Sequence, residues 1–305
     1  MELARSCLAM GWQVTAFTRN PQKAAEAEKL GARAVLGGLQ STDWWGELSS
    51  QYDHAVNCVG AAAPSIEGYR ASYLEGMHSI EGWLKETNQS LQNLIFTSSS
   101  SVYPQTDGSL VDEESTNVGV SARGQILLDA EQVCLQVPQA YARRRTVVRF
   151  SGLYGPGRHL LVDKIRRGEP MTGSPNRVLN LTHRDDAASA VLAILQSTSS
   201  FEGGIFNASD GQHATRGEIV DWVASRVGVP KPAFIDVDED KGPHRRVDSS
   251  KIGQVFGLKF TPGEPVVNCP RLIDLFLRLQ NFPQHRSPVL QTTTLKNDGV
   301  ALSLS

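Results

Sequence analysis

The sequence predicts an α/β fold built on a doubly wound parallel sheet, and three observations support this prediction. Short apolar runs of strand length alternate with longer amphipathic segments, which is typical of βα units whose sheet carries helices on both faces. A chain of 305 residues is long enough to bury a large core. Hydrophobic residues make up 40% of the chain and charged residues 20%, a balance that excludes wholesale disorder.

The expected strands are short and rich in β-branched or aromatic residues. They cover residues 14–17, 34–36, 54–59, 94–97 and 146–150. The expected helices show apolar residues at helical spacing, and the first two end at a glycine, a common helix terminator. They cover residues 2–10, 22–30, 70–86, 122–137, 185–196, 216–227 and 271–279.

The regular alternation of strands and helices ends near residue 150, so we expect the chain to divide there. Residues 1–150 would form the sheet domain. Residues 151–282, which contain Gly- and Pro-rich loops, would form a smaller substrate-binding lobe. Residues 283–305 are polar and rich in Thr and Ser, and we expect them to form a flexible tail.

Composition and charge exclude several classes of protein. The formal net charge of −2, from 30 Lys plus Arg against 32 Asp plus Glu, gives no overall electrostatic reason to bind nucleic acid or a membrane surface. No apolar run approaches the ~20 residues that span a bilayer. The four cysteines are scattered and the histidines lack ligand spacing, so we expect buried thiols and no metal. With no secretory signal at the N-terminus, we expect a soluble cytoplasmic protein.

One part of the expected sheet is missing from the front of the sequence. A doubly wound nucleotide-binding sheet normally opens with a strand, a G-x-G-x-x-G turn and a helix whose N-terminus holds a pyrophosphate. Here the chain begins within the expected first helix, and no G-x-G-x-x-G occurs. Two explanations are open: the chain lacks roughly 10–15 N-terminal residues, or the sheet closes differently and cofactor binding is weak or lost.

This gap predicts a local defect in the fold. We expect the helix at 2–10 to be poorly anchored, and the strands at 14–17 and 54–59 to be either adjacent or separated by a gap. A central strand drawn from elsewhere, such as residues 299–304, is the least favoured alternative because connections between neighbouring elements are normally short.

Four segments resemble those of the extended and atypical short-chain dehydrogenases/reductases, specifically the NAD-dependent epimerase/dehydratase family. They read TSSSSVY at 97–103, VVRFSGLYGPGR at 147–158, NLTHRDDAA at 180–188 and FNASDG at 206–211. The resemblance runs from residue 1 to about residue 280 and implies a Rossmann-like fold. It also implies an NAD(P)-dependent oxidoreductase or an epimerase/dehydratase-like enzyme for a small substrate, with a sugar derivative as one option.

The resemblance places a dinucleotide cofactor along the ends of the strands. Arg19 stands where relatives carry the residue that reads the ribose, and the absence of an acid beside it favours NADP over the alternative, NAD. A solvated turn for Arg19 and close strand–helix packing at Gly60 are the structural alternatives. The implied cofactor-binding residues are Thr18, Arg19, Leu39, Val59, Gly60, Ala61, Phe150 and Gly152.

The catalytic residues depart from the family pattern. Relatives use a Ser that orients the substrate oxygen, a Tyr as acid/base and a Lys that lowers the pKa of the Tyr. The Tyr-x-x-x-Lys pair is absent, because the helix that should carry it begins Ser-Ala-Arg-Gly-Gln at residues 121–125. The implied catalytic candidates are Ser99, Ser101 and Tyr103. The implied substrate-binding residues are Tyr154, Arg158 and His183, with helix capping as the structural alternative for His183.

Three hypotheses about function therefore stay open at this point. The first is the enzyme just described. The second is a non-catalytic NAD(P)-binding sensor or scaffold protein, which the missing Tyr-x-x-x-Lys pair favours. The third is a truncated form with impaired cofactor binding. In each case the expected partner is a small molecule, and the resemblance further implies a homodimer, although no feature of the sequence tests that.

Overall fold

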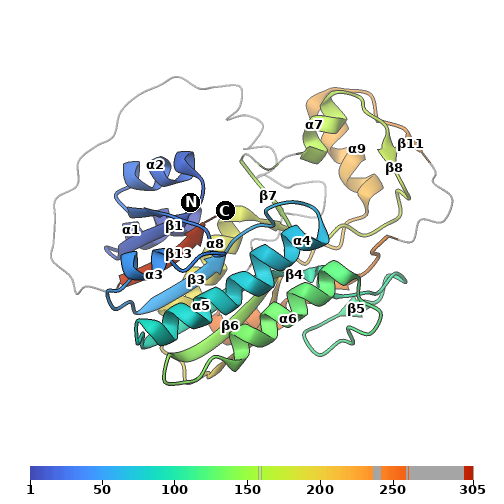
Figure 1. Cartoon of the computed structure of the whole chain (residues 1–305). Coiled ribbons are helices and arrows are strands. Elements are labelled where there is room, and N and C mark those ends of the chain that lie inside the picture. The colour runs from blue at the N-terminus through green and yellow to red at the C-terminus, as the bar shows by residue number, and fades with distance from the viewer. Residues whose placement is uncertain (157, 159, 236–241, 259, 261–298, 305) are drawn as a thin grey trace.

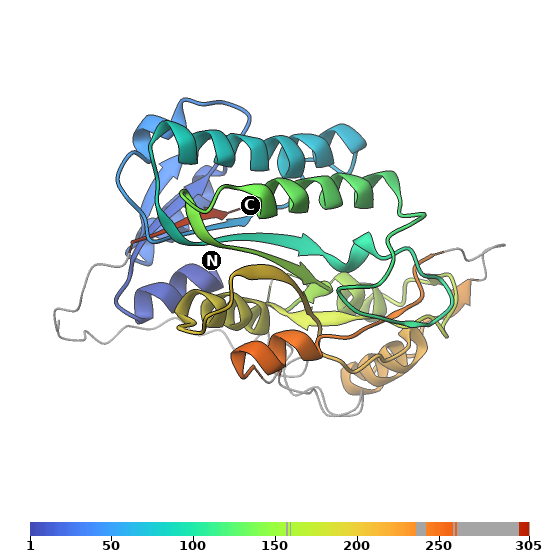
Figure 2. The same ribbon diagram turned by 90° about the horizontal axis from the view of Figure 1, so that it is seen from below.

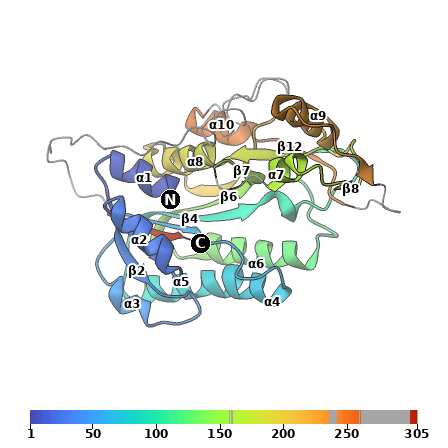
Figure 3. The ribbon, with the colours of Figure 1, turned by 90° about the horizontal axis from the view of Figure 1, so that it is seen from above.

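The protein contains one seven-stranded sheet in which every pair of neighbouring strands is parallel. The computed structural model describes residues 1–304 except 157, 159, 236–241, 259 and 261–298. The strand order is β10-β6-β4-β3-β13-β1-β2, and helices cover both faces of the sheet, as Figure 3 shows. The predicted α/β fold with a doubly wound parallel sheet is confirmed.

The large sheet contains all five predicted strands. Its members are β1 (Gln13–Thr18), β2 (Arg33–Leu36), β3 (His54–Cys58), β4 (Leu91–Ser99), β6 (Ala142–Phe150), β10 (Gly203–Ala208) and β13 (Gly299–Leu304). Six short strands form three separate parallel pairs outside it. These are β5 (Leu110–Val111) with β12 (Arg246–Val247), β7 (Gly152–Tyr154) with β9 (Leu181–His183), and β8 (Met171–Thr172) with β11 (Phe234–Ile235).

The six predicted helices that lie within the described residues are present, together with four α-helices that were not predicted. They are α1 (Glu2–Ala9), α2 (Pro21–Lys29), α3 (Trp44–Glu47), α4 (Ile66–Tyr69), α5 (Glu75–Glu86), α6 (Ala122–Gln136), α7 (Leu160–Arg166), α8 (Arg184–Gln196), α9 (Arg216–Val227) and α10 (Ser250–Phe256). A π-helical turn, η1 (Arg70–Leu74), joins α4 to α5, and a 3₁₀ turn, η2 (Ser100–Val102), follows β4. The helix expected at 271–279 lies outside the described residues.

Each face of the sheet has its own apolar core. Helices α5 and α6 cover one face, where Met77 and Leu127 are fully buried against strand residues such as Phe96. Helices α1, α8 and α10 cover the other face, where Ile194 and Ile252 are fully buried. Figure 2 shows the sheet nearly edge-on, with helices on both sides of it. Because helices cover both faces, residues 94–96 of β4 and 146–148 of β6 are fully buried.

The central position of the sheet is filled by a strand from the far end of the sequence. Strand β13 pairs with β1 on one side and with β3 on the other, through five paired positions on each side. Figure 1 shows it as the red strand between β1 and β3. The expectation that β1 and β3 would be adjacent or separated by a gap is therefore wrong. The backbone groups of their facing edges require a ladder partner, and residues 299–304 supply it.

Helix α1 is firmly packed, which corrects the expectation that it would be poorly anchored. Leu3, Ala4 and Cys7 point into the core and are at most 7% exposed. The Glu2 carboxylate also forms an ion pair at 3.1 Å with Arg184 at the start of α8. The helix is held because its apolar face packs against α8 as well as against the sheet.

The large sheet contains strands from both sides of the domain boundary expected near residue 150. Strand β10, from beyond residue 150, joins the large sheet, while α7, α9, β8 and β11 form the neighbouring lobe seen in Figure 1. Of the expected tail, residues 299–304 form β13 and residues 283–298 lie outside the described residues. Within the described part of the chain, no helix combines the length and apolar character needed to cross a membrane.

A proline in β13 tests the central strand. We expect Ala301→Pro to lower the free energy of unfolding by about 3 kcal/mol or more, because proline removes a backbone donor from the middle of a sheet. The matched control is Ala301→Gly, which keeps the N–H and should cost about 1 kcal/mol or less. Urea unfolding measures both variants, and equal midpoints would contradict the position of β13.

Candidate functional site

A cleft of about 680 Å³ opens at the carboxyl ends of the central strands. Its floor is formed by Cys58 at the end of β3, Ser99 at the end of β4 and Phe150 at the end of β6. The first residues of α1 and α8 also line the cleft, as do Ser151, Gly152 and Arg158 after β6. This is the edge at which ligands bind in open α/β sheets.

A smaller hollow of about 40 Å³ lies at the ends of β1 and β2. It is lined by Thr18 and Arg19 after β1 and by Leu39 after β2. Val59 and Gly60, which follow β3, line both this hollow and the larger cleft. The two cavities are therefore neighbours along a single path over the strand ends.

The turn after β3 is fixed by side chains that bind its backbone. The Val59 amide donates to Asn57 Oδ1 at 3.3 Å, and Asn57 is buried beside Met77. The Ala62 amide donates to Ser72 Oγ at 2.8 Å, which joins this turn to the π-helical turn η1. These contacts hold Gly60 at the junction of the two cavities.

The structure separates the three catalytic candidates. Ser99 lines the cleft, and its Oγ accepts a hydrogen bond of 3.2 Å from the Ser101 amide. Ser101 is exposed and is not among the residues that line the cleft, and Tyr103 is only 1% exposed. Ser99 is thus the one of the three with access to a ligand in the cleft.

Tyr103 belongs to a buried polar network behind the cleft. Its hydroxyl donates to Asn207 Oδ1 at 2.8 Å and accepts from Arg149 at 3.0 Å. The Arg149 guanidinium also binds both carboxylate oxygens of Glu131, the shortest contact being 2.7 Å, and Ser98 donates to the same carboxylate at 2.6 Å. Burial alone would lower the pKa of Arg149, but the Glu131 carboxylate raises it above its usual value. Burial raises the pKa of Tyr103, which keeps this phenol protonated.

The three substrate-binding candidates also differ in position. Arg158 lines the cleft, whereas Tyr154 and His183 are not among its lining residues. His183 is 4% exposed and caps α8, since its Nδ1 accepts from the Asp185 amide at 3.3 Å. Tyr154 packs edge-on against the His183 ring at 5.1 Å. Gly155 has a φ of +138°, and a Cβ there would lie 3.1 Å from His183 Nε2, so only glycine allows this close approach.

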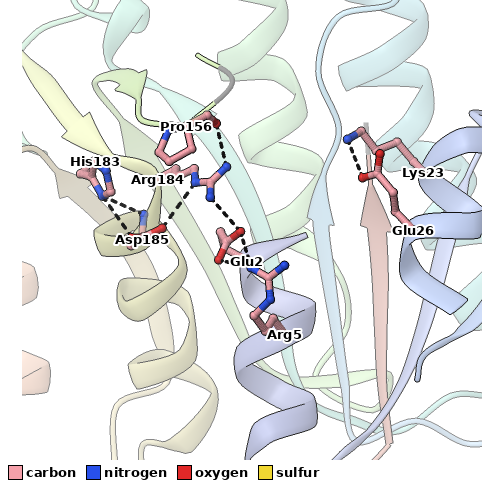
Figure 4. A network of polar contacts seen from close by, with 8 residues as sticks. All are labelled: Glu2, Arg5, Lys23, Glu26, Pro156, His183, Arg184 and Asp185. Carbon is pink, nitrogen blue, oxygen red and sulfur yellow. Dashed lines mark hydrogen bonds and ion pairs between the residues drawn. The ribbon is translucent and has the colours of Figure 1, made fainter. Parts of the chain in front are cut away.

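Two charged residues that line the cleft were not predicted from the sequence. Arg184 joins three segments, because it binds Glu2 of α1 and the Pro156 carbonyl oxygen while belonging to α8 (Figure 4). Lys23 of α2 also lines the cleft and pairs with Glu26 at 2.9 Å. Arg184 could have been selected from the sequence because it directly follows the candidate His183, whereas nothing in the sequence singled out Lys23.

A tyrosine in the cleft was missed as well. Tyr73, from the π-helical turn η1, lines the cleft together with Ser99 and Gly60. The sequence shows an ordinary amphipathic segment over residues 70–86, and its periodicity gives no sign of the wider turn at its start. A π-helical turn inside a helix is often found at functional sites, so this is the structural signal that the periodicity hides.

Comparison with known families identifies the chain. Residues 2–209 match the model of the NAD dependent epimerase/dehydratase family, which is more than half of the chain. The protein belongs to this family. The prediction made from the four sequence segments is therefore confirmed. No curated protein matches the chain.

Several solved structures share the fold of the chain at low sequence identity. The UDP-glucuronic acid 4-epimerase from Bacillus cereus, in complex with NAD, is 17% identical and has a TM-score of 0.74 over 92% of this chain and 95% of that chain. MoeE5, in complex with UDP-glucuronic acid and NAD, is 21% identical with a TM-score of 0.74 over 91% and 95%. A conserved protein of unknown function from Silicibacter pomeroyi DSS is 21% identical, with a TM-score of 0.67 over 90% and 94%. At these identities the likeness establishes the fold.

The family name implies a dinucleotide, and the residues over the strand ends fit one. Arg19 lines the hollow at the ends of β1 and β2, and the junction at Gly60 leads from it to the cleft floor at Ser99. Met1, Glu2 and Leu3, at the start of α1, also line the cleft.

Replacing one partner of the buried ion pair tests the network behind the cleft. We expect Glu131→Gln to lower the free energy of unfolding by about 3–5 kcal/mol, because it leaves the Arg149 charge buried without a carboxylate. Glu81→Gln is the matched control, since Glu81 pairs with Lys85 on the surface and should contribute less than about 1 kcal/mol. Chemical denaturation measures both, and equal losses would contradict the assigned role.

Proposed function

We propose that this protein binds a nicotinamide dinucleotide and acts as an oxidoreductase or epimerase on a small nucleotide-sugar substrate. The observation that carries the proposal is the continuous path over the strand ends, from Arg19 through Gly60 to Ser99. Family membership and the NAD complexes of the structural neighbours support it. When bound, the dinucleotide would supply or accept a hydride at its nicotinamide ring.

Each part of the path has a distinct task in this proposal. Thr18, Arg19 and Leu39 would hold the adenosine end, and Val59, Gly60, Phe150 and Gly152 would border the nicotinamide end. Ser99 would orient the substrate oxygen by a hydrogen bond from its hydroxyl. Arg158 and Arg184 are the cations at the substrate end of the cleft, which favours a substrate that carries phosphate or carboxylate.

NADP is the form of the cofactor that the hollow favours. Arg19 lines it, and its described lining contains no carboxylate to bind the free ribose hydroxyls of NAD. A guanidinium beside this ribose pairs favourably with a 2′-phosphate, so the charge balance supports NADP over NAD.

The direct test is calorimetric titration with NADPH, NADH and UDP-glucuronic acid, followed by an assay for turnover of the sugar nucleotide. Micromolar binding of either dinucleotide together with turnover supports the enzyme. Binding without turnover of any carbonyl or sugar-nucleotide substrate favours the alternative, a non-catalytic dinucleotide sensor or scaffold. A protein that melts cooperatively and binds neither dinucleotide contradicts the proposal.

The preference for NADP rests on one side chain. We expect Arg19→Ala to weaken NADPH binding by about 10- to 100-fold, because one charge-assisted contact to phosphate is lost, while NADH binding changes less than about threefold. Arg33→Ala is the control, since Arg33 pairs with Glu47 and does not line either cavity. Equal losses for both dinucleotides in calorimetry would contradict the assignment.

A further inference from the structure

Arg184, which lines the cleft, has more hydrogen-bond donors than the acceptors around it use. A guanidinium carries five N–H donors. One Nη of Arg184 donates to the Pro156 carbonyl oxygen at 2.7 Å. Its Nε–H is buried and has no hydrogen-bond acceptor within the described part of the chain, because the Asp185 carboxylate at 3.5 Å attracts it only by charge. A buried N–H without an acceptor costs free energy, so a further acceptor at this position is stabilising.

The stem of Arg184 is fixed, whereas its charged end reaches the cleft. The backbone of Gly155 packs against the stem, and a Cβ at Gly155 would lie 3.0 Å from Arg184 Cγ and 3.2 Å from Cδ. The hydrogen bond to Pro156 holds the same segment. The Arg184 side chain is 33% exposed and lines the cleft. Arg184 can therefore change its acidic partner without leaving residues 155–156.

Glu2 is the acid that pairs with Arg184 across the cleft lining. Its Oε1 lies 3.1 Å from Arg184 Nη2, and both of its carboxylate oxygens accept from Arg5 Nη1 at 2.7 Å. Figure 4 shows Glu2 between the two guanidinium groups. Because Arg5 binds both oxygens, Glu2 keeps a cationic partner when Arg184 turns to another anion. Such an exchange leaves neither charge unpaired, so it avoids the cost of an isolated charge.

The charges that line the cleft favour a diphosphate. Among the described lining residues, one acid, Glu2, stands against three cations, which are Lys23, Arg158 and Arg184. Glu26 and Asp185 pair with two of these cations from outside the lining, but both acids are about half-exposed, so water screens their charges. The lining thus has an excess of two positive charges. A diphosphate diester carries two negative charges at neutral pH, and guanidinium groups bind phosphate with paired hydrogen bonds.

We propose that Glu2 competes with the ligand for Arg184, and that the diphosphate of the ligand displaces it. The inference rests on the proposed function, in which Arg184 binds an anionic group. A phosphate oxygen accepts the buried Nε–H of Arg184, and the Glu2 carboxylate stays on Arg5. Glu2 thus lowers the affinity of the cleft for its ligand, and Arg184 raises it. Dinucleotides and nucleotide sugars both carry the diphosphate, so the test uses one of each.

The first test is calorimetric titration of Glu2→Gln with NADPH and with UDP-glucuronic acid. This variant keeps the shape of the side chain and removes its charge. We expect at least one ligand to bind about three- to fivefold more tightly, because the competing ion pair is partly exposed. The ligand that responds is the one whose diphosphate displaces Glu2. Unchanged or weaker binding of both ligands overturns the inference.

Glu28→Gln is the matched control for the change in charge. Glu28 is exposed on α2 and is not among the residues that line either cavity. Its replacement removes the same charge from a neighbouring helix, and we expect both affinities to change less than about 1.5-fold. An equal gain for Glu28→Gln and Glu2→Gln overturns the inference, because the effect would then come from net charge.

A double-mutant cycle tests whether the competition takes place at Arg184. Arg184→Ala should weaken binding of the responding ligand by about tenfold or more, and Arg184→Gln is the second variant if Arg184→Ala does not fold. When Glu2→Gln is added to either, we expect a further change of less than about 1.5-fold, because the two anions no longer share a guanidinium. A three- to fivefold gain that persists without Arg184 overturns the inference.

The wild type separates this inference from the proposed function. If the wild type binds either ligand and Glu2→Gln binds neither more tightly, the inference alone is wrong. If the wild type binds neither NADPH nor UDP-glucuronic acid, the proposed function has failed and the inference fails with it.

Discussion

The buried ion pair between Glu131 and Arg149 holds together the parts of the molecule that meet at the cleft. Arg149 lies on β6 and Glu131 on α6, and both side chains are at most 3% exposed. Through Ser98 the pair reaches the end of β4, and through Tyr103 and Asn207 it reaches β10. A charge pair taken out of water tolerates little displacement, because each lost contact leaves a desolvated group. The strand ends that form the cleft floor are therefore fixed relative to one another.

Much of the fold follows from patterns that the sequence displays locally. Short runs rich in apolar and β-branched residues locate β1, β3, β4 and β6, because strands covered on both faces favour such residues. The origin of the central strand could not be predicted in this way. Residues 299–304 carry the same short apolar pattern as other candidates, and what places them between β1 and β3 is the need of two facing backbone edges for a partner. This requirement arises only in the assembled sheet, so it cannot be predicted from the sequence of either strand.

The candidate site was predictable where it depends on strand ends, and unpredictable where it depends on helix geometry. Arg19 and Gly60 come just after strands and Ser99 ends one, so their place at the carboxyl edge follows from the topology. The family-like segment at 180–188 suggested that His183 binds substrate, but its side chain caps α8 and is not among the residues that line the cleft. Tyr73 escaped notice since a π-helical turn changes the direction of a side chain without changing the apolar spacing on either side.

The position of β13 also bears on the order in which the sheet can form during synthesis. Six of the seven strands are complete once residue 208 has left the ribosome, yet β1 and β3 must wait for residues 299–304. Contacts between segments nearly three hundred positions apart are among the slowest to form in a folding chain. Until then the nascent protein carries two unpaired edges in the middle of its sheet, the kind of surface that favours association with other chains.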